Sequence, residues 1–197
     1  MLDWLKNINK EYPQFWKTYL SKFDKKPNRF VVLSTETSGT HPNQDVIYSF
    51  GAIAVKNDQI LIGDSFEATL LQYKYLHDNG LPNTFLIESK QPKMAEQQAV
   101  ESFIEFLGNS VLVGYRIHYT LELINSALDK LYCGRLKNEA LDLEIMHKKS
   151  HDIDGQIPLD KLLSIYKLTK HETDTTAENA YNLALIFIKL KNKLGIS

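Results

Sequence analysis

Cysteine is almost missing from this chain of 197 residues, in which Cys133 is the only one. An internal disulfide is therefore impossible, and a reducing, cytoplasmic location is expected. Long hydrophobic runs are missing too, and no stretch approaches the roughly 20 apolar residues that span a bilayer. The segment Met1 to Lys6 lacks the apolar run of a signal peptide. We therefore expect a protein that makes no contact with membranes.

An excess of charge of one sign is lacking as well. The chain carries 23 basic and 24 acidic residues, for a formal net charge of −1, so no overall field indicates a nucleic-acid partner. Its hydrophobic content of 43% and charged content of 24% are typical of a globular protein. The length predicts one domain with a substantial core.

Residues 1–28 predict a helical extension ahead of this domain. Their apolar residues recur at helical spacing, and Pro13 is expected to start a second helix. We expect the aromatic face of this N-terminal arm to dock against the domain, a second copy or a partner protein. The lysines of the arm are expected to face outward, where a solvated helix face is the default and phosphate contact the alternative. The aromatic residues are Trp4, Phe15, Trp16, Tyr19 and Phe23, and the lysines are Lys10, Lys17 and Lys22.

From residue 29 onward the pattern changes to strands followed by alternating helices and strands. Residues 30–33 form a short continuous apolar run, typical of a central strand covered on both faces. Further strands are expected over 46–55, 60–70, 111–114 and 140–143, and helices over about 99–107, 119–132, 158–163 and 175–194. This order predicts an α/β fold, with a five-stranded mixed sheet flanked by helices.

Three segments carry the most specific pattern. Residues 31–39 run Val-Val-Leu-Ser-Thr-Glu-Thr-Ser-Gly, residues 113–120 run Val-Gly-Tyr-Arg-Ile-His-Tyr-Thr, and residues 174–180 run Asp-Thr-Thr-Ala-Glu-Asn-Ala. In this order they resemble the three motifs of the DEDDh 3′–5′ exonucleases, the family of the proofreading epsilon subunit of bacterial DNA polymerase III. The resemblance covers roughly residues 29–190. It implies a ribonuclease-H-like fold for residues 29–197.

The resemblance also implies where the site lies. The family has four metal-binding carboxylates and a base histidine, and only Glu36 keeps its carboxylate here. Aligning the family histidine with His171 would put the last aspartate at Thr176. We prefer the alignment through Asp174, because the alanines that follow then match at Ala180 and Ala184. The site positions in family order are then Ser34, Glu36, Thr120, Asp174 (the base histidine) and Asn179.

The chemistry of the family depends on these carboxylates. Two divalent ions about 4 Å apart repel each other unless several carboxylates neutralise them, and Mg²⁺ prefers hard oxygen ligands. Ser34, Thr120 and Asn179 offer neutral oxygens only. Helical spacing places Thr120 and Asn179 on the apolar faces of their helices, so we expect them beside Ser34 and Glu36 at one end of the sheet, with Asp174 nearby. We expect no bound metal or cofactor.

Several interpretations remain open. The leading one is a protein that has lost catalysis and acts by binding single-stranded nucleic acid or a protein partner, with Thr35, Thr37, Tyr115 and Arg116 as nucleic-acid contacts. The alternative is an active 3′–5′ exonuclease on DNA or RNA that uses Mg²⁺ or Mn²⁺ and a relocated ligand, Asp174 or Asp45. A purely structural subunit is the third.

Simpler explanations exist for individual residues. Glu36 is also compatible with a strand-end residue satisfied by nearby hydroxyls. The spacing of Thr175 and Glu178 predicts a capping box at the start of a helix. His147 and His151 lie four positions apart, but without a third ligand they are expected to be a solvated pair.

Overall fold

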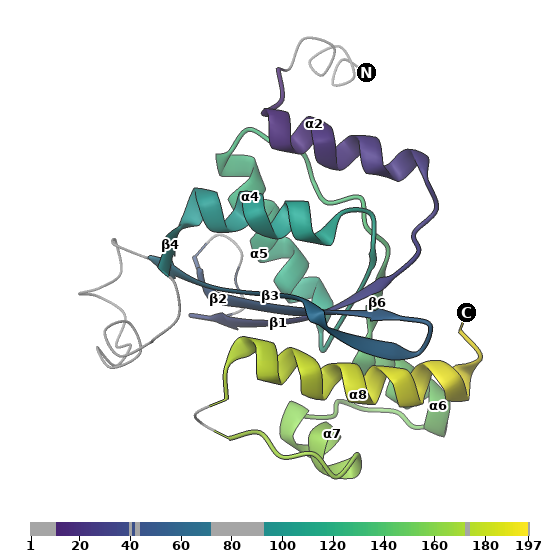
Figure 1. Cartoon of the computed structure of the whole chain (residues 1–197). Helices are drawn as coiled ribbons and strands as arrows, with labels where there is room; N and C mark the ends of the chain where they lie inside the picture. The colour runs from purple at the N-terminus through teal and green to yellow at the C-terminus, as the bar shows by residue number, and fades with distance from the viewer. Residues whose placement is uncertain (1–10, 40, 42–43, 72–92, 172–173, 197) are drawn as a thin grey trace, which may run out of the picture.

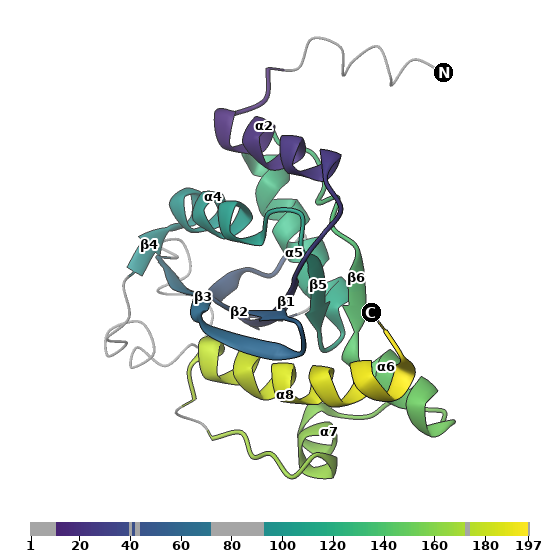
Figure 2. The ribbon, with the colours of Figure 1, turned by 45° about the vertical axis from the view of Figure 1, so that its right-hand side comes forward.

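The computed structural model describes residues 11–39, 41, 44–71, 93–171 and 174–196. Its centre is a six-stranded sheet in the order β4-β3-β2-β1-β5-β6, and helices cover both faces (Figures 1 and 2). Helices α2, α4 and α5 lie on one face, and α6, α7 and α8 lie on the other. The elements are α2 (Gln14–Ser21), η1 (Lys22–Asp24), β1 (Phe30–Thr37), β2 (Ile47–Lys56), β3 (Gln59–Leu71), β4 (Lys93–Ala95), α4 (Glu96–Leu107), β5 (Val111–Gly114), α5 (Ile117–Lys130), β6 (Ala140–Asp142), α6 (Leu143–His151), α7 (Leu159–Ile165) and α8 (Thr176–Leu194).

Strand β1 occupies the middle of the sheet. It pairs antiparallel with β2 and parallel with β5, where Phe30 lies opposite Val111. The outer pairs are antiparallel between β2 and β3 and parallel between β3 and β4 and between β5 and β6. The predicted α/β fold with a mixed sheet is confirmed, although the sheet has six strands and not five. The additional strand β4 has only three residues, too few to produce an alternating pattern in the sequence.

Two apolar clusters cover the two faces of the sheet. Val31 and Leu33 belong to the cluster that includes the buried side chains of α4 and α5. Val32, between them, belongs to the cluster that includes the buried side chains of α8. This alternation confirms that β1 is covered on both faces, as its continuous apolar run predicts.

Helix α6 is absent from the sequence prediction, which extends the preceding strand through Leu143. Strand β6 instead ends at Asp142, whose carboxylate accepts hydrogen bonds from the backbone N–H groups of Glu144 and Ile145 and thereby caps α6. The buried face of this helix includes the polar residues Glu144 and His147. These two residues interrupt the apolar periodicity by which an amphipathic helix is recognised.

The N-terminal arm docks onto the domain through α2. Trp16 and Tyr19 are each 1% exposed and belong to the same cluster as α4. The Tyr19 hydroxyl donates to Asn138 Oδ1 at 2.7 Å and accepts from the Lys137 N–H at 2.8 Å. Lys17 is exposed as predicted, whereas the prediction for Lys22 is wrong: it is half-buried, and its ammonium donates to the Glu105 carbonyl at 3.0 Å. Trp4 and Lys10 lie outside the described residues.

Within the part of the chain that the structure describes, no helix has both the length and the apolar character needed to cross a membrane.

Candidate functional site

A pocket of about 270 Å³ opens at the carboxyl ends of β1 and β5. Ligands of open α/β sheets bind in this kind of position, beyond the carboxyl ends of the strands. Its lining combines residues of β1 and of the turn between β5 and α5 with Leu159 of α7 and Leu183 of α8. The polar lining side chains are Ser34, Thr35, Thr37, Tyr115, Arg116, Tyr119 and Thr120.

The pocket thus gathers six of the positions predicted from the sequence, which are Ser34, Thr35, Thr37, Tyr115, Arg116 and Thr120. Glu36, Asp174 and Asn179 are not among its lining residues. The first and second motifs therefore both contribute to the pocket, whereas the positions of the third motif, Asp174 and Asn179, do not line it.

Side chains alternate along β1, and the pocket takes residues from both faces at the end of this strand. Thr35 and Thr37 share a face with Leu33, toward α4 and α5, whereas Ser34 and Glu36 share the opposite face with Val32, toward α8. The hydroxyl oxygen of Thr35 lies 3.1 Å from that of Thr120 on α5. Thr120 therefore makes a hydrogen bond with the residue that lies between the two carboxylate positions of the first motif.

Glu36 is half-buried and lies opposite Ser49 of β2. Burial raises the pKa of the Glu36 carboxyl, the positive charge of Lys170 acts to lower this pKa, and the negative charge of Glu67 raises it further. The one family carboxylate that the chain retains is therefore near a second carboxylate on β3 and an ammonium group from the segment before α8. Both neighbours come from distant parts of the sequence, so no spacing rule reveals them.

The start of α8 is fixed tightly against β2 and β3. The predicted capping box is confirmed, with Thr175 as the N-cap and Glu178 as its partner. The Thr176 hydroxyl lies 2.6 Å from the Ser49 hydroxyl, and Glu67 accepts a hydrogen bond from the Ala177 N–H at 3.0 Å. Thr176 is 2% exposed and Asn179 is 8% exposed. The two alternative positions for the last family aspartate are thus both buried on the sheet side of α8.

Neither relocated ligand considered for the alternative function lines the pocket, although the Asp45 carboxylate lies against Gly39, which does. Asp174 accepts a hydrogen bond from the His171 N–H at 2.8 Å. Asp45 accepts from the Ser38 hydroxyl and from the His41 N–H, each at 2.7 Å, and the bond from Ser38 is the main cause of its lowered pKa. Each carboxylate is held within its own loop. Among the described residues, no three His, Cys, Asp or Glu side chains gather to hold a metal ion.

The site therefore does not fit the two-metal centre of the exonuclease family. Hard cations need several anionic oxygens around them. Where the family has its first and third carboxylates, this pocket holds the hydroxyls of Ser34 and Thr120, and the second of these is already hydrogen-bonded to Thr35. No catalytic step through metal ions follows from these residues.

A polar network beneath the pocket holds Arg116, one of the predicted nucleic-acid contacts. Arg116 has a left-handed backbone (φ 46°) at the start of α5, and its Nε donates to Glu144 Oε2 at 2.8 Å. Glu144 also accepts from the Ile157 N–H at 2.7 Å, while the Tyr115 hydroxyl donates to the Ile157 carbonyl at 2.7 Å. Burial acts to raise the pKa of Glu144, but the bonds from Arg116 and Ile157 lower it overall.

Sequence reasoning missed the residues that organise this network. Asp142 caps α6 and also accepts from the Ile117 N–H at 3.0 Å, so one carboxylate joins the first turns of α5 and α6. An Asp that directly follows a short apolar run is a signal for a helix start. The partnership of Glu144 with Arg116 has no comparable signal, because it depends on the pairing of β6 with β5.

The prediction of a solvated histidine pair is wrong for His147. Its side chain is buried at 2% exposure, and its Nδ1 lies 2.9 Å from the Tyr166 hydroxyl. The rings of His147 and His151 are 4.2 Å apart. Burial lowers the pKa of His147, and the nearby charges of His151 and Lys193 lower it further. Helix α6 buries this residue because α8 packs against the same face.

Comparisons with known proteins show what the chain is similar to. The chain is similar to the "DNA polymerase III PolC-type" of Caldanaerobacter subterraneus subsp. tengcongensis, with 29% identity over 168 residues, 84% of this chain and 12% of the relative. It is also similar to the PolC-type polymerase of Ureaplasma parvum, with 26% identity over 84% of this chain and 12% of the relative. No family model matches the chain.

Solved structures of Escherichia coli exonuclease I share the fold. One, a complex with single-stranded DNA, superimposes with a TM-score of 0.61 at 16% identity over 87% of this chain and 42% of that one. Another, a complex with a dT13 oligonucleotide, gives 0.62 at 15% identity over 86% and 41%. Both comparisons are consistent with the resemblance of the three motifs to those of the DEDDh exonucleases. It spans only about 12% of the length of the PolC-type relatives.

Proposed function

We propose that the chain binds single-stranded nucleic acid in the pocket at the carboxyl ends of β1 and β5 and does not hydrolyse it. The observation that supports this most directly is the gathering of first-motif and second-motif positions in one pocket whose lining side chains include no carboxylate. The kinship with exonucleases makes a nucleic-acid strand the natural ligand. The missing carboxylates remove the charge that two metal ions need.

The lining suits a ligand with bases and a sugar–phosphate backbone. Tyr119 is 39% exposed and offers a ring face on which a base can stack. The hydroxyls of Ser34, Thr35 and Thr37 are of the kind that donate hydrogen bonds to phosphate and sugar oxygens. Arg116 supplies a positive charge, which Glu144 largely neutralises. With few free cations at the pocket, binding should depend only weakly on salt.

The decisive experiment measures binding and hydrolysis on the same oligonucleotides. Fluorescence anisotropy with labelled oligo-dT and oligo-U in EDTA should show metal-independent binding by the wild-type protein. Tyr119→Ala should weaken it by about tenfold, because stacking on an aromatic ring contributes roughly 1–3 kcal/mol per base. Tyr132→Ala is the matched control, since Tyr132 is exposed just beyond the opposite end of α5.

A second pair of variants tests the phosphate contacts. Thr37→Glu adds a negative charge at the pocket and should weaken binding, whereas Thr18→Glu, on the exposed side of α2, should not. The same oligonucleotides are then incubated with Mg²⁺ or Mn²⁺. Release of 3′ nucleotides that is lost in Glu36→Ala would support the alternative of an active exonuclease. The absence of binding to both oligonucleotides would refute the proposal.

A further inference from the structure

Glu144 is a buried carboxylate that contacts the proposed nucleic-acid pocket through Arg116. It lies in the first turn of α6, its side chain is 8% exposed, and it is not among the residues that line the pocket. One of its oxygens accepts from the Arg116 Nε at 2.8 Å, and the other accepts from the Ile157 N–H at 2.7 Å. The Lys148 ammonium lies 4.0 Å from this second oxygen, beyond hydrogen-bond distance. The close cationic partner of Glu144 is therefore Arg116.

The carboxylate of Glu144 is charged and cannot easily move away from Arg116. Burial acts to raise the pKa of Glu144, but the bonds from Arg116 and Ile157 lower it overall. The N-terminal end of a helix also favours a negative charge in its first turn. A buried carboxylate that loses its partners is strongly destabilised. Because a backbone N–H holds one of its oxygens, Glu144 is a fixed negative charge beside a pocket-lining arginine.

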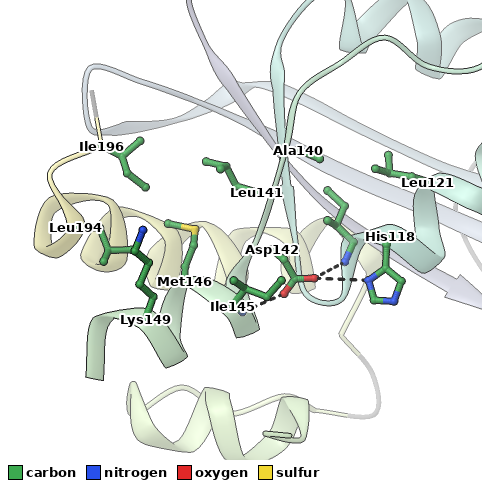
Figure 3. A pocket seen from close by; sticks show the side chains of 11 residues that line it. His118, Leu121, Ala140, Leu141, Asp142, Ile145, Met146, Lys149, Leu194 and Ile196 are labelled. Atoms are coloured by element: carbon green, nitrogen blue, oxygen red, sulfur yellow. Dashed lines mark hydrogen bonds and ion pairs between the residues drawn. The ribbon is translucent and has the colours of Figure 1, made fainter. Parts of the chain in front are cut away.

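Asp142, the carboxylate nearest in sequence, is committed elsewhere and cannot take over this role. It lines a separate cavity of about 480 Å³ between the start of α5, strand β6, helix α6 and the end of α8 (Figure 3). One of its oxygens accepts from the Ile117 N–H and lies 3.9 Å from the His118 Nδ1, while the other accepts from backbone N–H groups of α6. Among the described residues, Glu144 is the one acid that pairs with Arg116.

Arg116 can donate hydrogen bonds to a ligand, although its charge is balanced. Its side chain lines the pocket and is 31% exposed, and its Cζ lies 5.2 Å from the centre of the Tyr115 ring. Within the described part of the chain, only its Nε makes a hydrogen bond, so the two terminal amino groups keep their donors. A phosphate that approached them would gain a charge-assisted bond with the guanidinium. It would also meet the repulsion of the fixed Glu144 carboxylate.

We propose that Glu144 is a specificity-determining residue of the nucleic-acid pocket, because it withholds the positive charge of Arg116 from the phosphates of the ligand. Arg116 then donates to neutral acceptors, the oxygens and ring nitrogens of bases and sugars. This role rests on the proposed binding of single-stranded nucleic acid. Removing the negative charge of Glu144 is expected to strengthen binding, which the loss of a merely structural residue would not do.

Glu144→Gln tests this role, because the glutamine keeps the size of the side chain and an oxygen for the Ile157 N–H. Fluorescence anisotropy with labelled oligo-dT should show tighter binding than by the wild type at low salt. One added phosphate contact makes the log–log salt dependence steeper by about 0.7, so the advantage should shrink about fivefold between about 50 and about 500 mM salt. Glu122→Gln is the matched control. It removes the same charge from the exposed pair with Arg135 and should leave both quantities unchanged.

Two further measurements assign the effect to Arg116 and to phosphate. Adding Arg116→Met to Glu144→Gln should abolish the gain. An oligo-dT with methylphosphonate linkages keeps its bases but has no backbone charge, and the wild-type protein should bind it within about threefold of normal oligo-dT, since few counterions are released. This comparison needs no variant, so it remains informative even where Glu144→Gln lowers the thermal midpoint.

The outcomes separate this role from the proposed function. Binding by the wild type without a gain in Glu144→Gln, an equal gain in Glu122→Gln, or a loss well above threefold with the methylphosphonate would overturn the role of Glu144 and leave the binding proposal standing. Binding by Glu144→Gln alone, lost again with Arg116→Met, would refute binding by the wild type and support the role of Glu144. The absence of binding by both proteins would overturn both.

Discussion

The hydroxyl oxygens of Thr35 and Thr120 lie 3.1 Å apart, in a hydrogen bond between β1 and α5. In the exonuclease family the position of Thr120 carries a metal-binding carboxylate. The Thr120 hydroxyl that stands in its place is neutral and already makes a hydrogen bond with Thr35. It therefore offers no negative charge to a metal ion. A polar pocket with satisfied neutral groups is stable without metal, and this relationship underlies the first prediction.

Mg²⁺ and Mn²⁺ are expected to leave the thermal midpoint of the wild-type protein unchanged. An ion that binds only the folded state raises the midpoint in proportion to its affinity, and Glu36 is the only family ligand that remains. Thermal denaturation with and without each ion is the measurement. Ser34→Asp with Thr120→Asp restores two carboxylates and serves as the comparison. A Mn²⁺-dependent increase in the wild type that disappears in Glu36→Ala would contradict the prediction.

Glu36→Gln is expected to increase the free energy of unfolding at neutral pH. The folded-state pKa of Glu36 is raised above the unfolded value, chiefly by burial. Between these two pKa values the folded chain binds more protons, so stability falls as pH rises through this acidic window. The glutamine removes the cost of the buried charge, and its advantage should vanish at pH values below the window. Urea titrations across the acidic range measure this difference. Lower stability of the variant at neutral pH would show that Lys170 more than compensates for burial.

Arg116→Met is expected to lower the free energy of unfolding by about 1–3 kcal/mol, because it leaves a buried carboxylate without its charged partner. The Glu144 side chain is only 8% exposed, and that of Arg116 is 31% exposed. Arg135→Met, which breaks the more exposed pair with Glu122, is the control and should cost at most about 1 kcal/mol. Urea denaturation gives both values. Adding Glu144→Gln to Arg116→Met should restore part of the loss, and an additive effect would argue against the pairing.

The sequence predicts best where local rules and tertiary packing agree. The run from Phe30 to Leu33 is apolar at every position, and both faces of the sheet bury it. The capping box of Thr175 and Glu178 is likewise a local feature, so it could be identified from four consecutive residues. The motif resemblance adds the order of the strands, which no local pattern contains.

Prediction fails where partners come from distant segments. Glu36 depends on Glu67 and Lys170, and Arg116 depends on Glu144, and each pair meets only once the sheet has formed. Alternation along β1 also separates Thr35 from Ser34 and Glu36, so the pocket contains residues from both sides of the strand end. A motif written as consecutive letters does not show which face each residue takes.

Gly51→Ala is expected to destabilise the fold by about 1–3 kcal/mol, the usual cost of overpacking a core. A Cβ atom at this position of β2 would lie 2.1 Å from the backbone of Thr176, where the first turn of α8 rests on the sheet. Gly63→Ala is the matched control, because nothing lies within 4 Å of its Cβ position and the residue is exposed. Urea denaturation should therefore separate the two variants. Equal stability of both would mean that α8 can shift away from β2 at no cost.

Trp16→Ala is expected to lower the free energy of unfolding by about 3–5 kcal/mol, the range for removing a large aromatic side chain from a core. Trp16 is 1% exposed, and its ring stacks on that of Tyr19 at 4.6 Å between centroids. Lys17→Ala changes the exposed neighbour and should stay within about 0.5 kcal/mol of the wild type. Urea denaturation that leaves Trp16→Ala as stable as Lys17→Ala would show that the arm is a loose appendage. A large loss would instead make α2 an integral part of the domain, because the hydroxyl of Tyr19 also holds Lys137 and Asn138 ahead of β6.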